Sequence, residues 1–200
     1  MSESKPSGRG RPPSTSHEAV GRTALRLFAE RGFEETTVEE IAAASGVSRR
    51  TLFRYYPSKN DMVWGDFDSV LARLRAELEA TGEDEPIMEA LRRAVVASNH
   101  YPPHELPELR IRLTLISTVP ALQAHSMLRY EAWRRVVAEF VARRLGLGVD
   151  DLVPISIGWV ALGASMAAFV RWVSHPGEDL EEHLRRSYDV LVAGQGALLG

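Results

Sequence analysis

The sequence contains no cysteine in its 200 residues. This absence excludes disulfide bonds, thiol nucleophiles, iron–sulfur clusters and zinc sites built on cysteine. The chain also has no excess of positive charge, because 24 Lys and Arg residues stand against 27 Asp and Glu residues, for a net charge of −3. Binding to nucleic acid would therefore have to come from a local basic patch and not from the charge of the whole chain.

Signals for export, membrane insertion and catalysis are scarce as well. The first 16 residues contain no apolar run, so we expect no signal peptide. Residues 153–170 form an uncharged stretch of 18 residues, the lower limit for a membrane-spanning helix, which we interpret as a helix buried on most sides in a core or a subunit interface. No G-x-S-x-G, phosphate-binding loop, dinucleotide fingerprint or metal motif is present. We expect a cytoplasmic protein without membrane contact, enzymatic activity, cofactor or metal.

Most of the chain has the 3.6-residue periodicity of amphipathic helices, and no strand pattern is convincing, so the sequence predicts an all-α fold. Residues 1–16, rich in Ser, Gly, Pro and charge, predict a flexible basic arm. About nine helices are expected, four of them before residue 80, the fourth running unbroken from 58 to about 80. Later helices are predicted at 86–99, 105–117, 121–145, 151–174 and 179–198. The helices divide into a small unit over 17–60 and a larger one over 61–200.

A helix-turn-helix pattern lies in the small unit. Thr37-x-x-Glu40 is a capping box that begins one short helix, and Ser48 caps the next one, which Pro57 ends. Between them Ala44-Ser45-Gly46-Val47 forms the turn, where glycine tolerates a backbone conformation that other residues resist. Residues 45–59 contain four basic residues and no acid, whereas residues 60–200 contain 14 basic and 20 acidic residues.

This basic second helix has the side chains that duplex DNA needs. Arg49 and Arg50 can each read a guanine with a bidentate fork in the major groove. Hydrogen-bond donors suited to phosphates come from Ser48, Thr51, Tyr55 and Lys59. At the beginning of the preceding helix, the hydroxyl and backbone N–H of Thr37 are further candidates for a phosphate contact.

A continuous stretch of about 40 residues resembles the DNA-binding domain of TetR-type transcriptional regulators: ALRLFAERGFEETTVEEIAAASGVSRRTLFRYYPSKNDMV. Trp64-Gly65-Asp66-Phe67-Asp68 extends the resemblance to the branch associated with mycofactocin gene clusters. The resemblance implies a homodimer, a palindromic operator, and repression relieved by a small molecule. It also implies that Arg49, Arg50 and Phe53 face bases, that Thr37, Thr51, Tyr55 and Lys59 face the DNA backbone, and that Tyr56 belongs to the core.

The N-terminal arm carries a separate motif. Gly8-Arg9-Gly10-Arg11-Pro12 resembles the core of an AT-hook, in which arginines enter a narrow A·T-rich minor groove. Arg9 and Arg11 are therefore candidate DNA contacts, and an inert soluble tail is the alternative.

The larger unit is expected to supply ligand binding and dimerisation. Helices 151–174 and 179–198 are the interface candidates, because the first is rich in small residues and the second has a regular apolar stripe. An apolar pocket is predicted from seven large side chains: Phe67, Met88, Leu115, Met127, Trp133, Trp159 and Met166. Arginines at its mouth would meet an anionic head group: Arg110, Arg112, Arg129, Arg134 and Arg135.

The sequence predicts a ligand-responsive DNA-binding repressor, released by a small hydrophobic effector such as a long-chain acyl-CoA. An architectural DNA-binding protein without effector response is the alternative, and it would need neither a pocket nor so large a helical unit.

Overall fold

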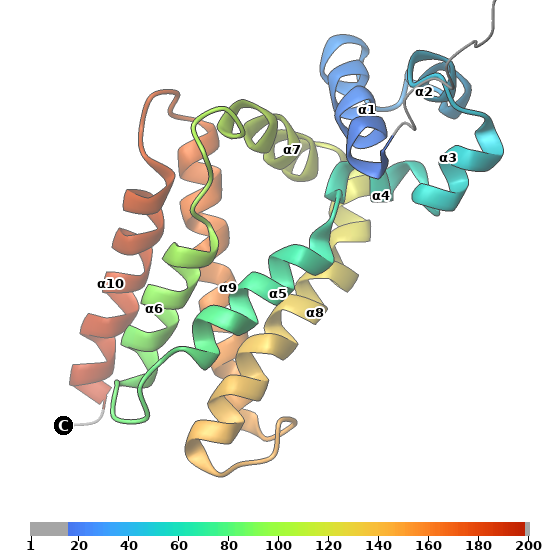
Figure 1. Cartoon of the computed structure of the whole chain (residues 1–200). Coiled ribbons are helices and arrows are strands. Elements are labelled where there is room, and N and C mark those ends of the chain that lie inside the picture. Colours follow the sequence, from blue (N-terminus) through green and yellow to red (C-terminus); the bar gives the residue numbers. More distant parts are fainter. Residues whose placement is uncertain (1–15, 199–200) are drawn as a thin grey trace, which may run out of the picture. The chain divides into compact units, whose positions relative to one another are not determined.

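The computed structural model describes residues 16–198, and within that range it contains ten α-helices and no strand (Figure 1). The chain divides into two compact units, one ending at Met62 and the other beginning at Val63. The helices have these bounds: α1 His17–Arg31, α2 Val38–Ala44, α3 Arg49–Tyr55, α4 Lys59–Trp64, α5 Phe67–Glu79, α6 Ile87–Ser98, α7 Leu106–Thr118, α8 Pro120–Leu145, α9 Leu152–Val173 and α10 Leu180–Leu198. The all-α prediction is confirmed.

In the small unit, both caps predicted for the helix-turn-helix form. Thr37 and Glu40 form the reciprocal capping box of α2, and Ser48 caps α3 by accepting a hydrogen bond from the backbone N–H of Thr51. Ser16 caps α1 in the same way, by accepting from the backbone N–H of Ala19. Gly46, at φ +66°, makes the turn between α2 and α3. These three helices enclose a common apolar core, with these buried side chains: Val20, Ala24, Leu27, Phe28, Phe33, Ile41, Leu52 and Tyr56.

The expectation of one unbroken helix over 58–80 is wrong, and this raises the helix count to ten. Gly65 interrupts it with φ +59°, in the left-handed region that favours glycine. Asp66 then begins a new helix, since its side chain accepts a hydrogen bond from the backbone N–H of Ser69 at 3.2 Å. The chain therefore turns between α4 and α5 and does not continue as a single rod.

The larger unit is a bundle in which α9 packs against both α8 and α10, and α6 packs against α5 and α10 (Figure 1). Its centre combines leucines with large aromatic side chains, among them Phe140, Trp172 and Tyr188, each at most 2% exposed. Tyr188 lies fully inside, where its hydroxyl donates to the carbonyl of Ala161 at 2.8 Å. Burial raises the pKa of this phenol well above its ordinary value, so Tyr188 stays neutral and acts as a polar link between α9 and α10.

Three arginines of this unit donate to carbonyl groups at the C-terminal ends of helices. Arg73 reaches the last residue of α6, Arg110 reaches the last two residues of α9, and Arg112 reaches Val63 near the end of α4. The carbonyls of a final helical turn have no partner within the helix and carry the negative end of the helix dipole. Each guanidinium therefore supplies both the missing donor and a favourable charge.

The helix α9, predicted to be buried in a core or a subunit interface, is only partly buried within the single chain. It is long and apolar enough to cross a membrane, but only 33% of its most apolar window is buried. Six of its large apolar side chains are exposed in the single chain: Leu152, Val153, Ile155, Trp159, Val160 and Val170. Such a uniform apolar face on one helix indicates a surface that another element covers.

Candidate nucleic-acid interface and regulatory unit

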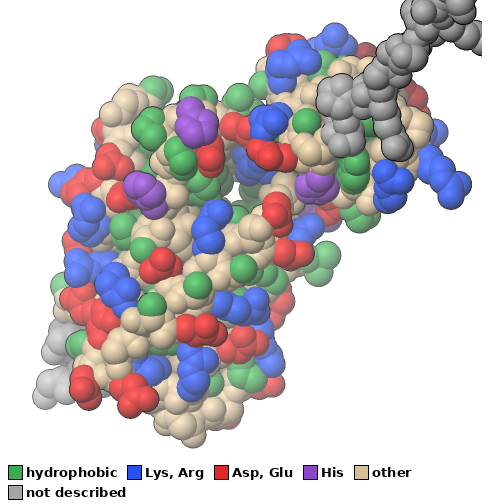
Figure 2. All heavy atoms as spheres, viewed as in Figure 1, with side chains coloured by type: hydrophobic (Ala, Val, Ile, Leu, Met, Phe, Trp, Pro, Cys, Tyr) green, Lys and Arg blue, Asp and Glu red, His purple; other side chains and the backbone are tan. Residues whose placement is uncertain are grey.

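The helix α3 presents a polar, basic face to solvent. Leu52 is fully buried and fixes the rotation of the helix. Tyr56, the residue after the last one of α3, is 2% exposed, as predicted for a core position. Because Leu52 faces inward, Arg49, Arg50 and Phe53 are all exposed. Figure 2 shows Lys and Arg side chains protruding where Figure 1 places α3. The residues predicted to face bases thus lie on the accessible side of one short helix.

Arg49 has a partner that the sequence pattern did not reveal. Its guanidinium lies 3.1 Å from the carboxylate of Glu39 on α2 and 5.5 Å from the centre of the Phe53 ring. The side chains of Arg49 and Glu39 are 67% and 61% exposed, so the pair is solvated and worth roughly 0–1 kcal/mol. A pair this weak leaves the guanidinium available to a stronger acceptor. The two residues are ten apart in the sequence, and only the turn between α2 and α3 brings them together.

Other predicted contact residues are already hydrogen-bonded within the small unit. The backbone N–H of Thr37 donates to Glu40 at 2.8 Å, which holds the pKa of that carboxyl below its ordinary value. The hydroxyls of Ser48 and Thr51 lie 3.0 Å apart, and Ser48 also accepts from the Thr51 backbone N–H. These groups first serve to cap α2 and α3, and a phosphate would have to share them.

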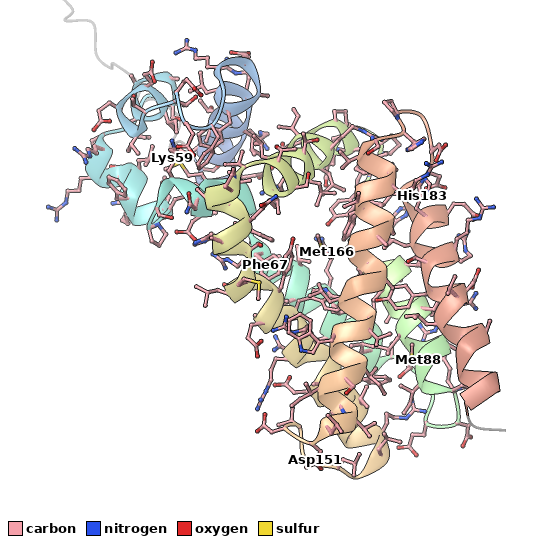
Figure 3. All side chains as sticks on the ribbon, turned by 180° about the vertical axis from the view of Figure 1, so that it is seen from behind. Lys59, Phe67, Met88, Asp151, Met166 and His183 are labelled. Carbon is pink, nitrogen blue, oxygen red and sulfur yellow. The ribbon has the colours of Figure 1, made fainter. Side chains whose placement is uncertain are left out.

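Lys59 lies at the beginning of α4 (Figure 3). Its ammonium donates to the carbonyls of Phe33 and Thr36, at 2.7 and 3.2 Å, and lies 4.3 Å from the centre of the Phe33 ring. An ammonium has three N–H donors, so these two bonds leave one for a phosphate. Lys59 thus fixes the segment between α1 and α2.

The first turn of α1 lies against the end of α3. The ring of His17 stacks on that of Tyr56 with a centroid distance of 4.1 Å, and the Tyr56 hydroxyl donates to the His17 carbonyl at 2.9 Å. The half-buried ring of Tyr55 is 6.0 Å from that of His17. Arg9 and Arg11 precede this point and lie outside the described residues.

The seven residues predicted to line a pocket have different environments. Phe67, Met88, Leu115 and Trp133 are buried, and Met166 is half-buried. Met127 and Trp159 are 53% and 49% exposed, so they face outward in the single chain. Phe67 is the first residue of α5 and Met88 is the second residue of α6, and Figure 3 shows the two well apart. Because α5 and α6 pack together and α5 has 13 residues, a rise of 1.5 Å per residue separates them by roughly 18 Å.

Two hollows are found elsewhere on this unit. One, between α5 and α8, has a volume of about 80 Å³, and the other, of about 310 Å³, lies where α9 ends and α10 begins. Charged side chains line the larger one throughout: Arg171, Glu178, Asp179, Glu182, His183 and Arg186. None of the seven predicted residues lines either hollow.

The arginines expected at the mouth of a pocket have other partners. Arg110 and Arg112 donate to helix ends, and Arg135 pairs with Asp150 at 2.7 Å. The guanidinium carbon of Arg134 lies 3.5 Å from the centre of the Trp159 ring. The guanidinium carbon of Arg129 lies 5.7 Å from the centre of the ring of Phe67, a buried aromatic of the predicted pocket.

Comparison with known proteins identifies the family. The model of the tetR family of bacterial regulatory proteins matches residues 22–63, and the MftR C-terminal domain matches residues 85–196. The candidate mycofactocin biosynthesis transcriptional regulator MftR of Mycobacterium tuberculosis is 40% identical over 185 residues, which cover 92% of this chain and 93% of that protein.

Solved structures show the same fold. The TetR-family repressor FadR of Thermus thermophilus, in complex with lauroyl-CoA, is 28% identical with a TM-score of 0.58, covering 88% of this chain and 93% of that one. The regulator FadR of Bacillus subtilis, in complex with stearoyl-CoA, is 15% identical with a TM-score of 0.64, covering 90% and 99%. Because both of its units match, the chain belongs to the TetR family of bacterial transcriptional regulators, in the group that carries the MftR C-terminal domain.

Proposed function

We propose that this regulator is a repressor that binds a palindromic operator as a homodimer and is released by a small hydrophobic effector. The observation that carries the proposal is the exposed basic face of α3, held by the buried Leu52 and Tyr56. A short helix with this arrangement enters the major groove with side chains toward the base edges. The two-fold symmetry of a dimer then requires two half-sites about one helical turn apart.

Base contacts are assigned to three residues of α3. Arg49 and Arg50 would each form a bidentate contact with guanine, and Phe53, 36% exposed, would contact a thymine methyl group. Because the Phe53 ring lies beside the Arg49 guanidinium, the two side chains would approach neighbouring base pairs together.

Backbone contacts are assigned to Ser48, Thr51, Tyr55, Thr37 and Lys59. The first three lie on or next to α3, so the docking that brings Arg50 to a base also brings them toward phosphates. Thr37 and Lys59 keep partners inside the unit, and we expect substitutions there to cost less affinity.

The arm would extend the contact beyond the major groove. Arg11 lies six residues before His17, whose ring stacks at the end of α3. A chain of six residues spans at most roughly 20 Å, enough to reach an adjacent minor groove. Arg9 and Arg11 would bind there, where a narrow A·T-rich groove attracts arginine.

The helices α9 and α10 would form the dimer interface, and we attribute the exposed apolar face of α9 to it. Trp159 is 49% exposed, and its ring lies on the Arg134 guanidinium, which has Glu131 as its ion-pair partner. An exposed tryptophan whose ring already packs on another side chain of its own subunit is typical of the residues that dominate the binding energy of an interface. This attribution also explains an apolar helix in a protein that we place in the cytoplasm.

The effector would bind in the larger unit near Phe67. Trp64, Phe67 and Tyr130 form an aromatic cluster with ring centroids 5.3 and 5.7 Å from Trp64, and Arg129 lies beside Phe67. An apolar chain with an anionic group suits such a site, and a long-chain acyl-CoA has both. A repressor of the same family binds lauroyl-CoA, which supports this class of effector.

Gel-shift titration with the DNA upstream of the protein's own gene tests the proposal. We expect a specific complex of one dimer per palindrome that lauroyl-CoA dissociates. Binding that no acyl-CoA weakens, at any chain length, would favour the alternative, an architectural DNA-binding protein without effector response.

A further inference from the structure

The connection between α4 and α5 joins the two units through the chain itself. The boundary between the units falls between Met62 and Val63, inside α4, so the end of α4 belongs to the regulatory unit. Gly65 turns the chain with φ +59° immediately after Trp64. We call the segment Val63–Asp66 the corner. A contact that holds the corner in place also holds the C-terminal end of α4, the helix that begins in the DNA-binding unit.

Arg112 of α7 holds this corner. One terminal nitrogen of its guanidinium donates to the Val63 carbonyl, and the other donates to Glu108, four residues earlier on α7, at 3.0 Å. The side chain of Arg112 is 20% exposed, so water competes only weakly for these bonds.

The close approach of Arg112 depends on glycine at position 65. A Cβ atom placed on Gly65 would lie 2.6 Å from the nearer guanidinium nitrogen and 3.2 Å from the guanidinium carbon. Any other residue at position 65 would thus meet two obstacles, the positive φ and the arginine itself. Changes to Arg112 and to Gly65 should therefore both weaken the contact between Arg112 and the Val63 carbonyl, and a change at Gly65 also strains the backbone.

Few buried side chains hold α7 in the larger unit. Among its thirteen residues, only Leu115 and Ile116, in the C-terminal half, are buried. The N-terminal half is held instead by polar bonds, from Arg112 to α4 and from Arg110 to the end of α9. A helix held in this way can shift at low cost if a ligand offers its arginines another acceptor or moves its neighbours.

We propose that Arg112 is a positioning residue for operator binding, a latch that holds the corner in its DNA-competent conformation and that the effector releases. The inference rests on the proposed function, since it names the residue through which the regulatory unit acts on α4. The effector then needs no contact with the DNA-binding unit. It only has to bind more tightly when Arg112 is away from Val63.

Loss of the latch changes the operator and effector affinities in opposite directions, whereas a general loss of stability does not. Removing the latch shifts the equilibrium from the competent to the released conformation, so operator affinity falls while effector affinity rises. The ratio of the two affinities changes by the full shift, about 10-fold to 100-fold for one charge-assisted hydrogen bond. A substitution that merely loosens the fold weakens both.

Three variants test this: Arg112→Gln, Gly65→Ala and the double variant. Operator affinity is measured by fluorescence anisotropy on the duplex that the wild type selects from a random library, and effector affinity by calorimetry with lauroyl-CoA. We expect each single variant to bind the operator less tightly and lauroyl-CoA more tightly, and the double variant to lose less operator affinity than the sum of the two singles, because both changes break the same contact. Arg110→Gln is the control, since it removes the same charge from the same helix but touches α9.

Amide hydrogen exchange reports on the latch without any effector. Arg112→Gln should speed exchange in residues 59–69 and leave 170–176 unchanged, and Arg110→Gln should do the reverse. Unchanged exchange at 59–69, or equal loss of affinity for DNA and lauroyl-CoA, would overturn the latch. A wild type that binds no specific DNA would instead refute the proposed function, and the exchange result would still decide whether Arg112 holds the corner.

Discussion

Arg110 and Trp172 form a stacked pair that also closes the end of α9. The guanidinium carbon lies 3.9 Å from the centre of the indole, and the same guanidinium donates to the carbonyls of Trp172 and Val173. The indole N–H in turn donates to the carbonyl of Glu178 at 2.9 Å. One arginine of α7 therefore fixes the last turn of α9 and, through Trp172, the segment that leads into α10.

Replacing Arg110 with methionine should destabilise the larger unit. The variant keeps the apolar stem but loses hydrogen bonds to two carbonyls and the contact with the indole, which together cost about 2 kcal/mol. Thermal unfolding followed by circular dichroism should show a midpoint lowered by roughly 4–8 °C. Arg171→Met, at an exposed position in the last turn of α9, is the matched control and should change the unfolding midpoint little.

Placing a charge on the exposed face of α9 should separate the subunits. Val160 is 47% exposed, next to Trp159, and a glutamate there would be desolvated in the proposed interface. Sedimentation equilibrium should show Val160→Glu as a folded monomer at concentrations where the wild type is a dimer. Leu128→Glu, on α8 at 73% exposure, should remain dimeric. Loss of the dimer in both variants would place the interface elsewhere.

Acid should weaken the loop between α5 and α6. Hydrogen bonds from the Arg93 guanidinium, at 3.0 and 3.1 Å, lower the pKa of Glu85 below its ordinary value of 4.5. A carboxyl with a depressed folded-state pKa stabilises the fold fully above pH 4.5 and loses that stabilisation as the pH falls through the folded-state pKa. Glu85→Gln should thus be less stable than the wild type at pH 7, and the difference should shrink as the pH falls below 4.5. Glu83→Gln, in the same loop, should unfold like the wild type at neutral pH.

The small unit was predictable from the sequence because its determinants are local. The capping box of α2, the Ser48 cap of α3 and the turn at Gly46 depend on residues within one or two helical turns. The core position of Tyr56 followed from the family resemblance, since the His17 ring on which it packs lies 39 residues away in the sequence. The ion pair between Glu39 and Arg49 was not predictable, because the angle between two helices decides it.

The larger unit was less predictable, since tertiary contacts determine its details. Periodicity continues across Gly65 and hides the break between α4 and α5, which Gly65 and the Asp66 cap make. The apolar content of α9 likewise predicted burial, whereas much of that helix is exposed in the single chain. Two of the five arginines predicted for an anion site, Arg110 and Arg112, donate to helix ends instead, and no local sequence pattern distinguishes the two roles.

Removing the arm should weaken operator binding without affecting the fold. A chain lacking residues 1–13 loses Arg9 and Arg11, and the slope of log K against log salt should fall by about two ions. Titrations at several salt concentrations measure that slope. The full-length chain with Arg9 and Arg11 both replaced by alanine is the control for the change in chain length. A slope identical to that of the full chain would mean that the arm is an inert tail.

Whether the exposed face of α3 recognises base sequence can be measured with the single variant Arg50→Ala. Arg50 is exposed on that face, so its removal should leave thermal stability unchanged. Affinity should be measured for the operator and for random duplex DNA at one fixed salt concentration. We expect a loss of about 1–3 kcal/mol on the operator and a much smaller loss on random DNA. Equal losses on both DNAs would show that Arg50 contacts phosphate alone and that α3 does not recognise bases through it.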